Sequence, residues 1–145
     1  MRATTFSYVD ADGEGIVRVA ECGVRFRARS VLAAGGELVV TTAHLRNFGV
    51  ATALLSVEGD RTVQTHVYRD SACRDRRISG ATKPFSLSFG KTTPIPSGAI
   101  LTFADTIRVR DIVGHSQGRE TYYFVAVVGL DGLRVEVPSG SLDLP

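Results

Sequence analysis

Acidic residues gather near the N-terminus, in the stretch VDADGEGIVRVAE. Counted from Asp10, carboxylates stand at positions 1, 3, 5 and 12 and a glycine stands at position 6. This is the ligand spacing of a calcium-binding helix-loop-helix, because Ca²⁺ is held by hard oxygen ligands around a sharp glycine bend. The candidate metal ligands are Asp10, Asp12, Glu14 and Glu21.

The residues on either side of this acidic loop are not typical of helices. The run TTFSYV before the loop is β-type, and CGVRFRARSV after it alternates with a period of two. The flanks therefore favour a β-hairpin whose turn uses Asp and Gly. Two alternatives stay open, a hairpin turn that holds a cation through its first three acids and a complete helical calcium site. Calcium is the one cofactor that the sequence suggests, and none is required.

The cationic side chains are almost all arginine, with 15 Arg against 2 Lys at a net charge of +2. Two groups are candidates for binding an anion or a partner, because arginine recognises carboxylate and phosphate groups in a bidentate manner. One is an alternating series within a single strand, and the other lies in a long polar loop. They comprise Arg25, Arg27, Arg29, Arg74, Arg76, Arg77 and Lys83. A solvated surface and a GC-rich genome would explain the same arginines without a ligand. Nucleic acid is not expected, because no aromatic residues interleave with the alternating arginines.

No catalytic motif is present in the sequence. The histidines His44, His66 and His115 are not at metal-ligand spacing, and there is no Gly-x-Ser-x-Gly and no phosphate-binding glycine loop. Cys22 and Cys73 are either two free thiols or one disulfide, since no Cys-x-x-Cys occurs. An enzyme is therefore not the favoured reading, and no catalytic residue is assigned.

The elements that must position these residues are strands. Alternating runs such as VRFRARSV, TIRVRDIV and LRVEV are separated by turn signals such as AAGGE, RNFG, KTTPIPSG and GLDG. We expect about nine strands in one all-β domain, an antiparallel sandwich of immunoglobulin-like or jelly-roll type over residues 1–138, with a tail over 139–145. A small β-barrel is the alternative fold.

Three stretches resemble bacterial immunoglobulin-like domains. GELVVTTAHLRNFGVATA is similar to their strand that ends in Asn-x-Gly, PIPSGAILTF to their Pro-x-Gly turn, and GRETYYFVAVVGLDGLRVEV to their closing hairpin. The resemblance spans residues 36–53 and 94–137, about half of the chain. It implies a sandwich and says nothing about a ligand.

The favoured function is a non-catalytic module that contacts another protein or copies of itself through a strand edge or loop tips. Phe48, Tyr122 and Tyr123 are candidate interface residues. Because Tyr122 and Tyr123 are adjacent, they face opposite sides of a strand, and we expect one in the core and the other exposed or at an interface. The alternatives are a barrel that binds a small ligand or shapes a pocket for a biosynthetic cyclisation, and a binder of an anionic polymer. No apolar run reaches the length of a membrane span, and no secretory signal is seen, so we expect a cytoplasmic protein or a mature form without its leader.

Overall fold

The computed structural model describes residues 5–9, 15–19, 23–57, 62–70, 91–114 and 118–145. These residues form ten strands, one short α-helix and one 3₁₀ turn. The elements are β1 (Thr5–Val9), β2 (Gly15–Val19), β3 (Val24–Ala33), η1 (Ala34–Gly36), β4 (Leu38–Asn47), β5 (Ala53–Val57), β6 (Gln64–Tyr68), β7 (Lys91–Ile95), β8 (Ile100–Arg108), α1 (Val109–Val113), β9 (Glu120–Leu130) and β10 (Leu133–Leu144). The described helical segments are far too short to cross a membrane.

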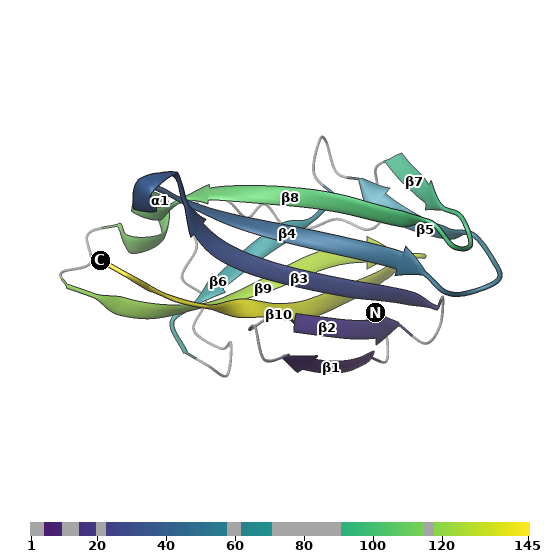
Figure 1. Ribbon diagram of the computed structural model, residues 1–145, viewed down its shortest axis with the longest axis horizontal. Coiled ribbons are helices and arrows are strands. Elements are labelled where there is room, and N and C mark those ends of the chain that lie inside the picture. The colour runs from purple at the N-terminus through teal and green to yellow at the C-terminus, as the bar shows by residue number, and fades with distance from the viewer. Residues whose placement is uncertain (1–4, 10–14, 20–22, 58–61, 71–90, 115–117) are drawn as a thin grey trace.

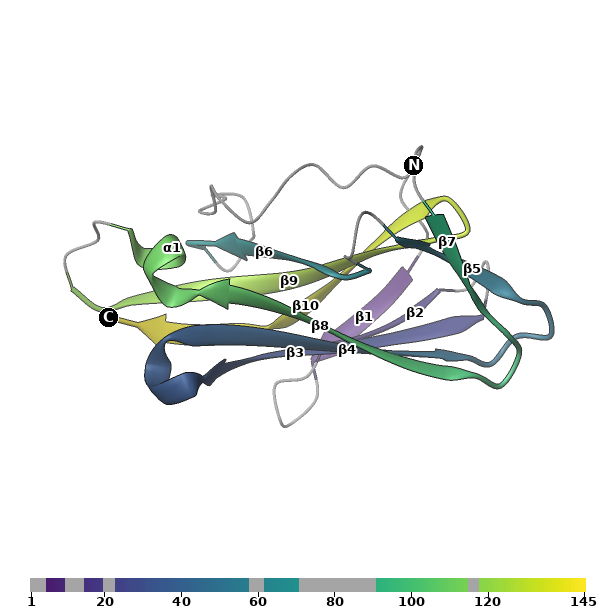
Figure 2. The same ribbon diagram turned by 90° about the horizontal axis from the view of Figure 1, so that it is seen from above.

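The strands make two antiparallel sheets that face each other (Figure 1). The front sheet has the order β1-β2-β3-β4-β8. The back sheet has the order β10-β9-β5-β7, and β6 pairs with β9 beside that path. Seen from above, the two layers are separate, and the described strands do not close into a barrel (Figure 2). The expected all-β sandwich is thus confirmed, and the alternative of a small closed barrel is wrong for the described strands.

Period-two alternation builds the front sheet. In β3 the residues Val24, Phe26 and Ala28 are fully buried, while the arginines between them are partly or fully exposed. The same alternation runs along β4, where Ala43 and Leu45 are fully buried. These side chains pack against β10 and β9, so one face of the front sheet closes the core and the other faces solvent.

The back sheet departs from this alternation in its middle strand. All residues from Phe124 to Leu130 in β9 are buried, because β9 pairs with β10 on one side and with β6 and β5 on the other, and both of its faces are shielded. A continuous apolar run such as YYFVAVVGL is typical of such a strand.

The C-terminal residues are part of the fold and not a tail. We expected residues 139–145 to extend beyond the domain, but β10 continues to Leu144, which is fully buried. The register of β10 on β9 shifts between Pro138 and Gly140, so the strand passes its proline at an irregularity and then resumes pairing. The polar residues PSG therefore mark a bulge within a strand rather than its end.

The N-terminal acidic stretch is flanked by strands. β1 and β2 pair antiparallel from Thr5 opposite Val19 to Val9 opposite Gly15. The complete helical calcium site is therefore wrong, because it needs a helix on each side of the loop. The intervening residues 10–14 lie outside the described part of the chain.

Candidate functional site

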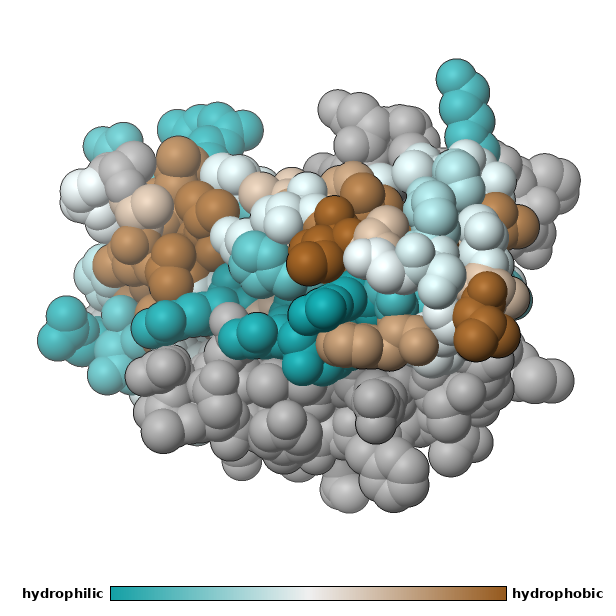
Figure 3. Space-filling model, turned by 45° about the vertical axis from the view of Figure 1, so that its right-hand side comes forward, coloured by the Kyte–Doolittle hydropathy of each residue, from teal (hydrophilic) through white to brown (hydrophobic). Residues whose placement is uncertain are grey.

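The outer face of the front sheet gathers cationic side chains from two neighbouring strands. The partly or fully exposed positions are Arg25, Arg27 and Arg29 on β3 and His44 and Arg46 on β4. The β3–β4 register places Arg25 opposite Arg46 and Arg27 opposite His44. We call these five residues the arginine face. Figure 3 shows the hydrophilic side chains as a band across the middle of this side of the molecule.

Two arginines of the arginine face, Arg25 and Arg46, stand directly opposite each other, and their repulsion by itself destabilises the folded protein. Like charges that stand directly opposite on antiparallel strands destabilise a sheet. Arg25 and Arg46 are such a pair, and Arg18 on β2 is the register partner of Arg25 on its other side. Arginine thus occupies the same row on three consecutive strands.

Phe48 partly offsets the repulsion between the two guanidinium groups. Its ring centroid lies 5.0 Å from the Cζ of Arg25 and 4.6 Å from the Cζ of Arg46. At an exposed site each such cation–π contact contributes about 0.5–1 kcal/mol. Phe48 remains 45% exposed, so its ring and the two guanidinium groups beside it lie at the surface of the sheet.

The turn after β4 fixes Phe48 in this position. The Phe48 N–H donates to the Gly23 carbonyl over 2.9 Å, and a Cβ atom on Gly23 would lie only 2.8 Å from the Gly49 Cα. Asn47 is buried, and its Nδ2 donates to the carbonyls of Ala51 and Ile95, both over 2.8 Å. Its Oδ1 accepts from the Gly49 N–H over 2.8 Å. The Asn-Phe-Gly sequence therefore forms a rigid turn, because one amide side chain satisfies three backbone groups.

A shallow depression of about 320 Å³ opens beside this turn. It is lined by Arg25, Arg27, His44, Arg46 and Ile100. The His44 Nδ1 lies 3.0 Å from the Thr102 Oγ1 on the neighbouring strand β8. This hydrogen bond fixes the orientation of the imidazole ring. The size suits a carboxylate-bearing side chain or another small anionic group rather than a large cofactor.

The described part of this face carries no negative charge. None of the outward positions on β3, β4 and β8 is Asp or Glu. Among the described residues, Arg25, Arg29 and Arg46 form no ion pair with a carboxylate. The Nε of Arg25 is buried and has no hydrogen-bond partner among these residues. A buried N–H donor without an acceptor costs roughly 1–3 kcal/mol.

Several predicted site residues lie outside the described ranges. These are the calcium candidates Asp10, Asp12, Glu14 and Glu21, the loop cations Arg74, Arg76, Arg77 and Lys83, both cysteines Cys22 and Cys73, and His115. Calcium binding, the loop cation site and the disulfide alternative therefore stay predictions. In the part of the chain that the structure does describe, no three His, Cys, Asp or Glu side chains gather as metal ligands.

The adjacent tyrosines point to opposite sides of β9. Tyr122 is fully buried in the core, and its hydroxyl donates to the Glu120 Oε2 over 2.9 Å. As expected for adjacent residues of a strand, one tyrosine is in the core and the other is not, and Tyr122, being the core residue, is not available for contact with a partner. Tyr123 is partly exposed on the other side of the strand.

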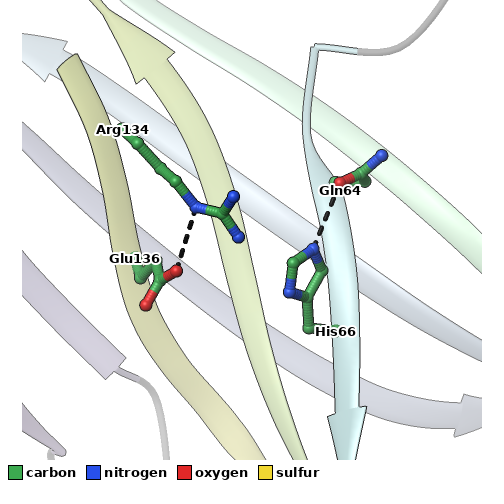
Figure 4. Close-up of polar contacts among 4 residues, drawn as sticks. All are labelled: Gln64, His66, Arg134 and Glu136. Carbon is green, nitrogen blue, oxygen red and sulfur yellow. Dashed lines mark hydrogen bonds and ion pairs between the residues drawn. The ribbon is translucent and has the colours of Figure 1, made fainter. Parts of the chain in front are cut away.

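A second polar group lies on the outer side of the back sheet. His66 and Gln64 of β6 are almost fully buried, and the His66 Nε2 lies 3.1 Å from the Gln64 Oε1 (Figure 4). On β10 the Arg134 Nε donates to the Glu136 Oε1 over 3.0 Å. The charged residues of this group, Arg134 and Glu136, pair with each other, so the group is a weaker candidate for binding a charged ligand than the arginine face.

Sequence reasoning identified three of the five residues of the arginine face. The alternation in VRFRARSV identified Arg25, Arg27 and Arg29, but it missed Arg46 and the involvement of His44. The register between β3 and β4 places these two residues beside the arginines of β3, and that register cannot be predicted from the sequence alone. Phe48 was expected to be an exposed contact, but its stacking on two arginines depends on the same register.

Comparison with known proteins gives no family. No family model matches the chain, and no curated protein matches it. Among solved structures, the chain is similar to the putative ApaA protein from Bordetella pertussis, at 12% identity over 99% of this chain and 96% of that one, with a TM-score of 0.37. It is also similar to the Pseudomonas fluorescens alkylpurine DNA glycosylase AlkC, solved bound to DNA containing an abasic site analog, at 22% identity with a TM-score of 0.37; 75% of this chain aligns with 25% of that one. A third structure, Northeast Structural Genomics Consortium target SoR45, has 13% identity over 83% of both chains and a TM-score of 0.36. At such low TM-scores these likenesses carry no argument about function.

Proposed function

We propose that this chain is a non-catalytic β-sandwich module that binds an acidic segment of a partner protein through its arginine face. The observation that carries the proposal is the register-opposed pair Arg25 and Arg46, held at the surface by Phe48 with no described carboxylate on that face. A carboxylate placed between the two guanidinium groups would turn their repulsion into two charge-assisted hydrogen-bonding pairs.

The strand geometry favours a protein partner over nucleic acid. Proteins that bind single-stranded nucleic acid stack bases on free aromatic rings. Phe48, the described aromatic side chain on this face, already has two guanidinium groups over its ring. Acidic side chains need no such stacking surface, and a flat sheet face with alternating arginines presents repeated bidentate donors to them.

The described core supports a binding module over a pocket-shaping enzyme or ligand carrier. A carrier of this size needs a cavity between its layers. Large side chains from both sheets, such as Phe26, Leu45 and Leu55, are fully buried and pack in one cluster in that space. The arginine face, by contrast, offers a shallow and solvent-open surface, which suits recognition of a side chain more than catalysis.

The proposal is tested by fluorescence anisotropy with a labelled oligo-glutamate peptide. The double variant Arg25→Glu, Arg46→Glu should lower the affinity at least about tenfold, since reversing both charges replaces attraction by repulsion. Affinity of the wild-type protein should fall as salt is raised from low to physiological concentration, because exposed charges are screened.

A matched control reverses the same number of charges elsewhere. Arg110 and Arg119 are exposed and lie outside the arginine face, in α1 and before β9. The variant Arg110→Glu, Arg119→Glu should keep most of the wild-type affinity. Equal losses for the two double variants would show that only net charge matters and would refute a site on β3 and β4. Tighter binding of a single-stranded DNA oligonucleotide than of the peptide would contradict the protein partner.

A further inference from the structure

β8 is the last strand of the front sheet among the described strands, and Figure 2 looks down on this edge. Among the described strands β8 pairs only with β4, from Ile100 opposite Arg46 to Arg108 opposite Leu38. The ladder continues beyond both ends of the strand. The Asn47 N–H donates to the Ala99 carbonyl, and the Val109 N–H donates to the Glu37 carbonyl.

These two hydrogen bonds show which backbone N–H and C=O groups of β8 point away from β4 and could pair with another strand. In an antiparallel pair the hydrogen-bonded residues alternate with residues whose N–H and C=O point away. Because residues 99 and 109 bond toward β4, the odd-numbered residues of β8 form the ladder. The even-numbered residues Ile100, Thr102, Ala104 and Thr106 therefore direct their N–H and C=O groups to the open edge.

The inward side of this edge is incompletely covered. Leu101 and Phe103 face the core but remain partly exposed, whereas their register partners Leu45 and Ala43 on β4 are fully buried. An added strand beside β8 would cover the remaining apolar surface of both residues, which contributes roughly 25 cal/mol per Å².

Three other described edges, β7, β10 and β6, carry features that hinder strand addition, whereas β8 contains neither proline nor lysine and its inward carboxylate, Asp105, accepts a hydrogen bond from the Thr65 N–H. β7 contains Pro94 and an exposed Lys91, and β10 has its irregularity at Pro138. On β6 the Thr65 N–H already donates to the Asp105 Oδ2 over 3.0 Å. Prolines, lysines, bulges and occupied donors are the usual protections of an edge strand. The outward side chains of β8 from Ile100 to Thr106 are uncharged.

We infer that the β8 edge pairs with β8 of a second copy of this chain, antiparallel about a two-fold axis at Ala104. The strand is self-complementary about that axis. Thr102 would stand opposite the partner's Thr106, a favourable cross-strand pair, and Leu101 opposite the partner's Ile107 on the inward side. Ile100 would stand opposite the partner's Arg108, so no two arginines meet. Such a dimer joins the two front sheets and places both arginine faces on one continuous surface.

Sedimentation analysis of the intact chain tests this pairing. The wild-type protein should sediment at twice the 15.5 kDa chain mass. Thr106→Pro should sediment as a monomer, because proline removes an N–H that points to the open edge while the β4 ladder uses only odd-numbered residues. Thr106→Val keeps that N–H and should remain dimeric. A wild-type monomer, or a dimer that survives Thr106→Pro, would overturn the inference.

A cross-linking measurement keeps the inference testable if the proline variant does not fold. In a Cys22→Ser, Cys73→Ser background, Ala104→Cys should form an intermolecular disulfide on mild oxidation, since residues facing each other at the axis lie about 5.5 Å apart between Cα atoms. Thr42→Cys is the matched control, because Thr42 is the register partner of Ala104 on β4, inside the sheet. Equal cross-linking of the two variants, or none at position 104, would contradict the pairing. Neither measurement depends on the arginine face.

Discussion

Arg46 illustrates a residue whose position is costly to the fold and useful at the surface. It stands opposite Arg25 across the strands and is exposed, with its guanidinium over Phe48. The repulsion from Arg25 and the attraction to Phe48 are of similar size, each below about 1 kcal/mol, so they nearly cancel. Arg46 therefore contributes almost nothing to the free energy of unfolding, yet its side chain is held in a fixed position at the surface. Both properties suit a residue that binds a partner.

Arg46→Gln should therefore separate stability from binding. The free energy of unfolding should change by less than about 0.5 kcal/mol, as at other surface positions. Affinity for the oligo-glutamate peptide should fall several-fold. Urea denaturation and anisotropy measure the two quantities, and Arg110→Gln is the control that should change neither. A large loss of stability in Arg46→Gln would make Arg46 a structural residue and remove this support for the site.

Asn47 has the opposite character, a buried side chain on which the local fold depends. Its amide joins the turn after β4 to the end of β7 through Ala51 and Ile95. Asn47→Asp should lower the free energy of unfolding by about 3 kcal/mol, because a carboxylate cannot donate and would be buried against two carbonyl oxygens. Thermal or urea unfolding measures the loss. Asn47→Ala removes the donors without adding a charge, so a milder effect of Asp than of Ala would contradict the assigned hydrogen bonds.

At the scale of elements, alternation in the sequence predicted the strands of the front sheet and which of their side chains lie inside. Arg25, Arg27 and Arg29 were correctly expected on one face of a strand, because a period of two needs only local information. The partnership of Arg46 with Arg25 was not predictable, since it depends on which strands are neighbours and in which register. β10 was misjudged for a related reason. Pro138 and Gly140 are local signals for an end, and pairing with β9 overrides them.

The continuation of β10 leads to a test in the second core cluster. Leu144 is fully buried there beside residues such as Tyr122 and Ile112. Leu144→Ala should destabilise the protein by about 3 kcal/mol through lost burial and the cavity left behind. Leu142→Ala is the matched control. Leu142 is only partly buried, so its loss should be about half as large or less. If the Leu144 variant melted like wild type, residues 139–145 would be a tail after all.

For the whole molecule, the apolar core and the charged surface lie on opposite faces of the front sheet. The back sheet and the inner face of the front sheet supply the apolar core, which leaves the outer face of β3 and β4 free to carry charge that folding does not use. The binding role that we propose would require only that the sheet present its arginines in a fixed pattern. Pairing of β8 edges would double that pattern on one surface.

The most direct test of the arginine face is a nuclear magnetic resonance titration of isotope-labelled protein with the oligo-glutamate peptide. The largest shifts should occur at the side-chain Nε–H groups of Arg25 and Arg46 and at the backbone amides of β3, β4 and Phe48, and they should diminish as salt is added. Shifts confined to β9 and β10, or none at all at peptide concentrations that saturate the anisotropy signal, would contradict the account.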